Sequence, residues 1–113
     1  MTGVKVVYMS RQFPHAICVE YARVALDYGM RAEDIKSIFS KAIERTPWPE
    51  WIDGRRAELT VEVFSSMSDV GRVRIAFPVK GKRRDAMEAF GEFESLLKMH
   101  AMLCRKEWQE HRS

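Results

Sequence analysis

Two neighbouring segments of the chain alternate between apolar and polar residues with a period of two, and they constrain the fold more than any other feature. The apolar positions are Leu59, Val61 and Val63 in the segment 57–65, and Val73, Ile75, Phe77 and Val79 in the segment 72–79. Such alternation is typical of β-strands with one buried and one solvated face, and a hairpin-length loop joins the two segments. The pattern predicts an antiparallel hairpin whose apolar face must be covered by other elements.

The stretch from His15 to Arg45 predicts two helices joined at Gly29. The segment 14–28 is apolar almost all round, and at about 100° per residue its only clear polar strip is Glu20, Arg23 and Asp27. This favours a central helix. A second helix is predicted over 31–45, because its apolar residues fall on one side. Gly29 stands where a helix C-terminus favours a residue that is free to take a positive φ.

The remaining segments complete a single α+β domain over residues 1–113. A β-rich run predicts a strand over 4–9, and a long apolar stripe predicts one helix over 82–111. The expected order is β-α-α-β-β-α, with a small antiparallel three-stranded sheet, helices packed on one face and a long C-terminal helix. A composition of 46% hydrophobic and 31% charged residues is that of a folded protein.

The sequence also bears on location. No apolar run approaches the roughly 20 residues that span a bilayer, so no membrane association is expected. The N-terminus lacks the pattern of a secretory signal. Two cysteines, Cys18 and Cys104, form no disulfide framework, and both are expected to be buried thiols on apolar helix sides. A cytoplasmic location is therefore expected.

Positive charge is concentrated in one part of the sequence. The net charge is +3, and the segment 70–84 contains six basic residues and no acid. These are Arg72, Arg74, Lys80, Lys82, Arg83 and Arg84, and Arg55 and Arg56 are expected to join them in space. The cluster predicts contact with nucleic acid or with an acidic protein surface. The alternative is a solvated cationic turn.

The predicted helical pair has the spacing of a helix-turn-helix motif. Ala25, Gly29, Ile35 and Ile38 meet its requirements for small and apolar residues. An ordinary helical hairpin with a glycine cap would have the same spacing. The exposed face of the second helix carries more acids than bases, with Glu33, Asp34 and Glu44 against Lys36 and Lys41. Such a face is poorly suited to the phosphate-lined grooves of DNA.

The order of elements and the segment Gly29-Met-Arg-Ala-Glu-Asp-Ile-Lys-Ser-Ile38 also resemble a KH domain. The segment from Arg72 to Leu97 resembles the closing part of that fold. The resemblance implies nucleic-acid backbone contacts at Gly29, Met30 and Arg31. This chain departs from the KH pattern at one position: Ala32 stands where the KH loop has its second glycine. The contact of a KH loop with the nucleic-acid backbone depends on that glycine.

Two groups of large apolar residues are candidates for protein contact. Trp48 and Trp51 lie in a proline-containing loop, as an interface anchor or as a lid folded over the core. Met87, Met99 and Met102 fall outside the main stripe of the C-terminal helix, whereas Leu103 widens one flank of that stripe. Adaptable methionines on such a side favour a homodimer through this helix.

No catalytic or metal-binding motif is present, so we expect no enzyme, no metal and no cofactor. His15, His100 and His111 are far apart and lack the companion residues of a metal motif. Two functions stay open. The first is a small non-enzymatic regulatory protein that contacts nucleic acid through the basic hairpin and helix start. The second is a protein-interaction inhibitor or adaptor, of the kind that mobile elements carry, which blocks a partner sterically.

Overall fold

The computed structural model describes residues 5–9, 16–64, 69–81 and 84–112. These ranges contain four strands, a short 3-10 helix and two α-helices, joined by turns and loops. They follow in the order β1 (Lys5–Met9), β2 (Ala16–Ala25), α1 (Ala32–Arg45), η1 (Gly54–Arg56), β3 (Glu58–Val63), β4 (Val70–Pro78) and α2 (Ala86–Arg112).

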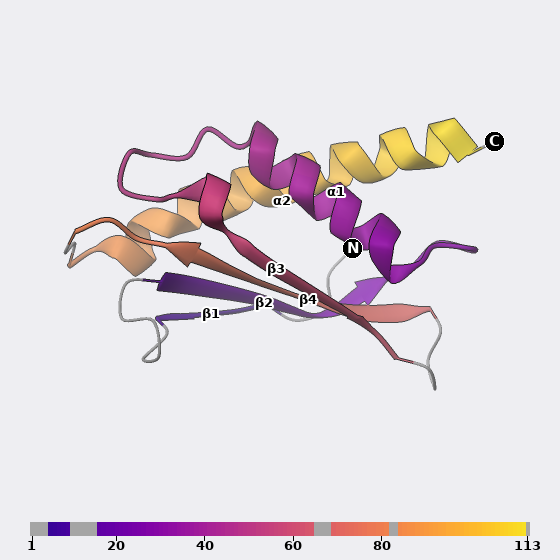
Figure 1. Ribbon diagram of the computed structural model, residues 1–113, viewed down its shortest axis with the longest axis horizontal. Coiled ribbons are helices and arrows are strands. Elements are labelled where there is room, and N and C mark those ends of the chain that lie inside the picture. The colour runs from indigo at the N-terminus through magenta and orange to yellow at the C-terminus, as the bar shows by residue number, and fades with distance from the viewer. Residues whose placement is uncertain (1–4, 10–15, 65–68, 82–83, 113) are drawn as a thin grey trace.

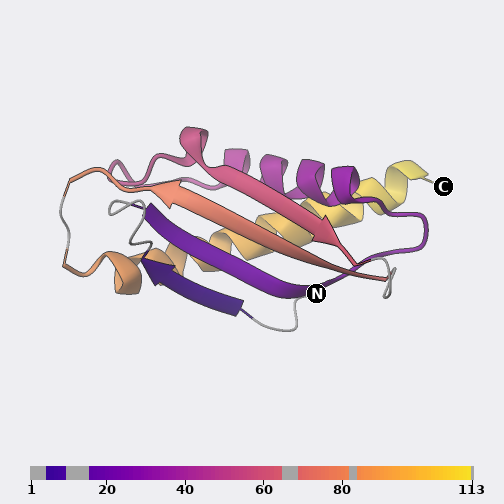
Figure 2. The same cartoon turned by 60° about the horizontal axis from the view of Figure 1, so that its bottom comes forward.

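The strands form one antiparallel sheet with the order β1-β2-β4-β3. Both α-helices lie on one side of the sheet, as the two views in Figures 1 and 2 show. The other side, here called the open face, carries no helix in the described part of the chain. The predicted α+β class and the long C-terminal helix are confirmed, but the sheet has four strands instead of the expected three.

The helix predicted over 14–28 is wrong, because residues 16–25 form the strand β2. This strand lies between β1 and β4, and Val19 is paired with Val7 on one side and with Ile75 on the other. Residues 16–19 are all buried. An inner strand that is buried on both faces is apolar all round, and periodicity alone does not distinguish it from a buried helix.

This correction also rules out the two motifs that depend on a helix over 14–28. Both the helix-turn-helix and the KH resemblance require a helix before Gly29, and the structure has a strand there. Gly29 does take the predicted positive φ, of 79°, but it belongs to a turn that leaves a strand. In that turn the Met30 N–H donates to the carbonyl of Asp27 at 2.9 Å.

The predicted hairpin is confirmed as β3 and β4, with Leu59 opposite Ile75 and Val61 opposite Val73. The strands are 58–63 and 70–78 instead of 57–65 and 72–79. The helix predicted over 31–45 spans 32–45, and the helix predicted over 82–111 spans 86–112. The strand predicted over 4–9 spans 5–9, and residue 4 lies outside the described ranges.

The core lies between the sheet and the helices. Its largest fully buried side chains are Ile17, Val19, Tyr21, Val24, Ile35, Phe39, Val73, Ile75, Phe77, Phe90 and Leu97. At about 1.5 Å per residue, the 27 residues of α2 extend for roughly 40 Å. Its C-terminal part runs past the end of the sheet (Figure 1).

Candidate functional site

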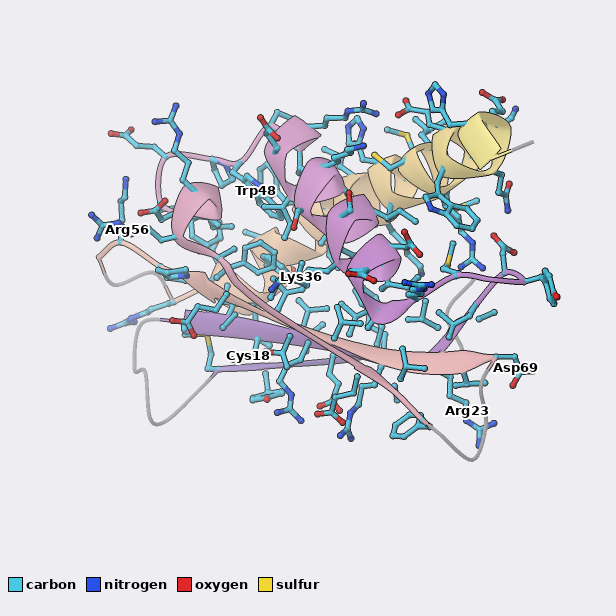
Figure 3. All side chains as sticks on the ribbon, turned by 45° about the vertical axis from the view of Figure 1, so that its right-hand side comes forward. Cys18, Arg23, Lys36, Trp48, Arg56 and Asp69 are labelled. Carbon is cyan, nitrogen blue, oxygen red and sulfur yellow. The ribbon has the colours of Figure 1, made fainter. Side chains whose placement is uncertain are left out.

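The structure separates the predicted basic cluster into two groups. Arg72 and Arg74 lie on the open face of the sheet, because the alternate residues of β4 face the helices and are buried. Arg55, Arg56 and Lys80 lie instead at the end of the sheet where β4 stops. Figure 3 shows Arg56 at one end of the molecule and Arg23 near the other. Lys82 and Arg83 lie outside the described residues.

The arginines on the open face are held by acids of the neighbouring strands. Arg72 donates to Glu62 of β3 at 2.6 Å and lies 3.6 Å from Glu20 of β2, while Arg74 lies 3.7 Å from the same Glu20 carboxylate. The hydrogen bond with Glu62 raises the pKa of Arg72 above its ordinary value. The Arg72 guanidinium also lies 5.7 Å from the centre of the Phe64 ring. These two arginines and two glutamates therefore form a balanced network of charges, in which neither arginine is held apart from an acid.

Backbone hydrogen bonds bring the other basic residues together. The Lys80 N–H donates to the carbonyl of Trp51 at 2.8 Å, and the Asp53 N–H donates to the carbonyl of Pro78 at 2.9 Å. The 3-10 helix η1, which carries Arg55 and Arg56, begins directly after this junction. Its arginines therefore lie beside the turn that follows β4.

We call Arg55, Arg56 and Lys80 the basic end. All three are exposed, and the ion pair described there joins Arg56 to Asp53 at 3.6 Å. The side chain of Arg56 is 83% exposed, so this pair contributes little to stability and leaves the guanidinium accessible. Arg84 is also exposed and precedes the first turn of α2, where the helix dipole adds positive potential.

A hollow of about 820 Å³ opens beside the basic end, between the last turns of α1, the loop 46–53 and the start of β3. Apolar side chains in its lining include Ile43, Ile52 and Leu59. Its charged lining residues are of both signs and comprise Glu44, Glu50, Asp53, Arg55 and Lys80. The hollow therefore offers apolar surface next to charged groups of both signs.

The two tryptophans line the inner side of their loop. The centre of the Trp48 ring lies 4.6 Å from the centre of the Phe77 ring and 6.1 Å from that of the Phe90 ring. The indole N–H of Trp48 donates to the Ile43 carbonyl at 2.8 Å. Trp51 is half-buried and packs against the same core. This geometry is that of a lid over the core, and Trp48, which is half-buried, also lines the hollow.

The predicted methionine surface is also divided. Met87 is half-buried and packs against the core, whereas Met99 and Met102 are 45% and 58% exposed. Leu103, which the sequence pattern assigns to the flank of the covered stripe, is 49% exposed and lies beside them. These three residues form an apolar strip on the outer side of α2.

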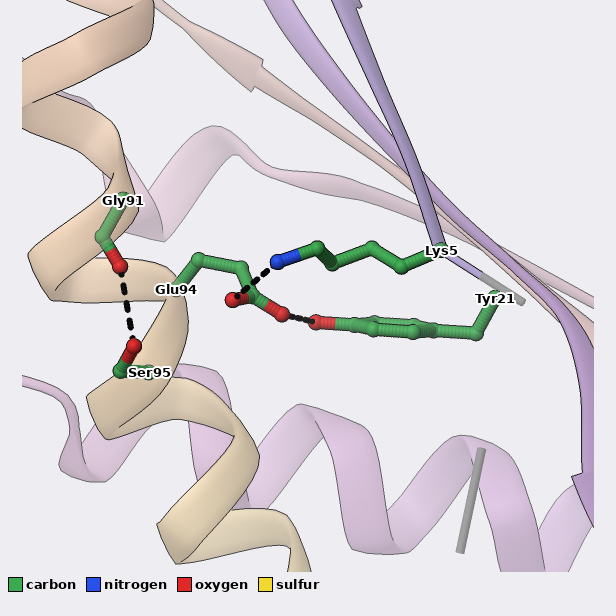
Figure 4. Close-up of polar contacts among 5 residues, drawn as sticks. All are labelled: Lys5, Tyr21, Gly91, Glu94 and Ser95. Atoms are coloured by element: carbon green, nitrogen blue, oxygen red, sulfur yellow. Dashed lines mark hydrogen bonds and ion pairs between the residues drawn. The ribbon is translucent and has the colours of Figure 1, made fainter. Parts of the chain in front are cut away.

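One buried polar contact was missed by the sequence analysis. Glu94 of α2 is 2% exposed and accepts a hydrogen bond from the Tyr21 hydroxyl at 2.6 Å and another from the Lys5 ammonium at 3.0 Å (Figure 4). Burial, and then the contact with Glu94, raise the pKa of Tyr21 well above its ordinary value. The sequence does indicate a buried acid at this position, because Glu94 lies within the apolar stripe of the helix between Phe90 and Leu97.

Comparisons with protein-family models, with curated protein sequences and with solved structures found no match to this chain. In the described part of the chain, neither α-helix has the length together with the apolar run that a membrane span requires. Within the same residues, no group of three His, Cys, Asp or Glu side chains gathers in a way that could hold a metal ion.

Proposed function

We propose that this chain is a non-enzymatic regulatory protein that contacts nucleic acid through its basic end. One observation carries the proposal: the junction between residues 51–53 and 78–80 brings exposed arginines and an exposed lysine from separate parts of the sequence together. Arginine and lysine at such a surface neutralise phosphates and release their counterions, which is the main source of affinity for a nucleic-acid backbone.

The proposal differs from the sequence prediction in the residues that carry the contact. Arg72 and Arg74 share the carboxylate of Glu20, and Arg72 is also bound by Glu62. A phosphate would have to compete with these acids. Arg55, Arg56, Lys80 and Arg84 remain the candidate contact residues, and Lys82 and Arg83 lie between the last two in the sequence.

A salt series tests the proposal. Fluorescence anisotropy of labelled single-stranded and double-stranded DNA and RNA is measured with the wild type and with R55A/K80A. We expect wild-type affinity to fall steeply with salt, and the slope of log K against log salt to be reduced by about two in the variant.

The matched control is K36A/K41A, which removes the same charge from exposed positions of α1. This variant should keep most of the wild-type affinity. The proposal is refuted if the wild type binds none of the four nucleic acids at low salt. An affinity that does not depend on salt, or an equal loss in both double variants, also refutes it.

The hollow beside the basic end favours a second candidate function, an inhibitor or adaptor that binds a protein. Glu44 and Glu50 would repel a phosphate backbone, whereas a protein partner could offer a basic group to these acids, an acidic group to Lys80 and an apolar side chain to Leu59. Steric occlusion of that partner would follow from binding.

The two candidates respond differently to two substitutions. E44Q/E50Q should strengthen nucleic-acid binding, because it removes negative charge beside the basic end. A protein partner that uses the apolar floor should instead be lost in L59D. Capture of a single protein that survives nuclease treatment and requires Leu59 would favour the inhibitor, provided that circular dichroism shows L59D to be folded.

A further inference from the structure

The outer side of α2 carries three large apolar residues where a helix that meets only solvent would be polar. The strip of Met99, Met102 and Leu103 lies opposite the buried stripe that includes Leu97 and Ala101. Adjacent half-exposed large apolar side chains on one helix typically mark an interface. The basic end does not include this strip, so the strip needs a separate explanation.

The charges around this strip are arranged for a second copy of the same helix. Met99 is the midpoint of α2, which spans 86–112. Glu92 lies seven residues before Met99 and Lys106 seven residues after it, and seven residues are close to two full helical turns. Both side chains are exposed on the same side as Met99. If two α2 helices pack antiparallel with a two-fold axis at Met99, each Glu92 faces the Lys106 of the other copy.

The same register places Ser95 opposite Leu103, which are four residues before and four residues after Met99. The Ser95 hydroxyl already donates to the Gly91 carbonyl of its own helix at 3.1 Å (Figure 4). Covering Ser95 with an apolar side chain therefore leaves no donor unsatisfied. Near the helix ends, Glu88 would face Glu110, where water and salt weaken the repulsion between carboxylates.

We propose that two copies of this chain form a homodimer through the outer side of α2, antiparallel, with the two-fold axis at Met99. In the dimer the two Met99 side chains meet at the axis and each Leu103 packs over Ser95 of the other copy, and the two Glu92–Lys106 pairs fix its direction and register. Such an interface is isologous, since each copy contributes the same surface. The inference does not depend on nucleic-acid binding.

Charge exchange tests the register. The masses of wild type, E92K, K106E and E92K/K106E are measured across a concentration series by size-exclusion chromatography with light scattering and by sedimentation equilibrium. We expect the wild type to approach about 26 kDa, twice the 13.2 kDa chain. Each single variant brings like charges together at two symmetric positions and should raise the dimer dissociation constant roughly tenfold. The double variant should restore wild-type dimerisation.

A second variant tests the apolar strip, and a matched variant controls for charge. M99E places two carboxylates at the two-fold axis and should give a monomer. K36E makes the same charge change as K106E on an exposed position of α1 and should remain dimeric. Because these positions are exposed, circular dichroism should give the same secondary structure for all variants.

Three results would overturn the proposal: a monomeric wild type at every concentration, a dimer that is unchanged in M99E, or a double variant that dimerises no better than either single variant. None of the dimer variants alters Arg55 or Lys80. The mass measurements therefore report on the dimer alone, and the anisotropy measurements report on nucleic-acid binding alone.

Discussion

Replacing Tyr21 with phenylalanine tests the buried contact that fixes β1 and β2 to α2. The Tyr21 side chain is fully buried, and its hydroxyl donates to a Glu94 carboxylate whose side chain is only 3% exposed. In Y21F the ring stays in place, but the carboxylate keeps only Lys5 as the other donor shown in Figure 4. Hydrogen bonds to charged groups contribute about 1.5–3 kcal/mol, so we expect unfolding to become easier by about 2 kcal/mol.

Urea denaturation followed by circular dichroism measures this loss. The midpoint should fall while the dependence of the unfolding free energy on urea stays constant, because the surface exposed on unfolding hardly changes. Tyr28→Phe is the control, since Tyr28 is 96% exposed and its substitution should have little effect. If Y21F changes the free energy of unfolding by less than about 0.5 kcal/mol, the contact does not stabilise the fold as argued.

The same contact predicts a loss of stability at alkaline pH. The pKa of Tyr21 is raised in the folded protein, first by burial and then by Glu94, above its ordinary value of 10.0. Above pH 10 the unfolded chain loses the phenolic proton while the folded chain keeps it, so unfolding becomes more favourable as the pH rises. The slope contributed by Tyr21 is at most about 1.4 kcal/mol per pH unit. The difference in stability between wild type and Y21F should therefore shrink above pH 10, and a constant difference would contradict the assignment.

Three further substitutions give expected outcomes. Gly54→Ala should lower stability by about 1–3 kcal/mol in thermal unfolding, because a Cβ there would collide with the Trp48 ring. Gly91→Ala, in the open on α2, should instead raise stability by about 0.5–1 kcal/mol in the same assay. Glu20→Gln removes the carboxylate that Arg74 shares with its neighbouring arginine on the open face, away from the basic end, and should leave the salt dependence of nucleic-acid binding in the anisotropy assay unchanged.

The candidate site was predictable only in part. The approach of Arg55 and Arg56 to Lys80 follows from the hairpin, because residues just before β3 and just after β4 meet at one end of the pair. The pairing of Arg72 with Glu20 did not follow, because Glu20 was assigned to a helix and only its place in β2 brings it beside β4. The hollow beside the basic end also depends on how α1 and its following loop pack against β3.

Local patterns by themselves determined the hairpin and both α-helices. Alternation in β3 and β4 and the one-sided apolar residues of α1 identify these elements, because each has one solvated face that makes its period visible. The tertiary structure decided the identity of residues 16–25. Neighbouring strands pair with both edges of β2, and its residues 16–19 are buried on both faces of the sheet. These residues are therefore all apolar, and they show neither the period of two of a half-exposed strand nor the period of about 3.6 of a half-exposed helix. Only the backbone pairing with β1 and β4 makes residues 16–25 a strand. These two neighbours supply the hydrogen-bond partners for the N–H and C=O groups of β2, which in a helix would bond to each other.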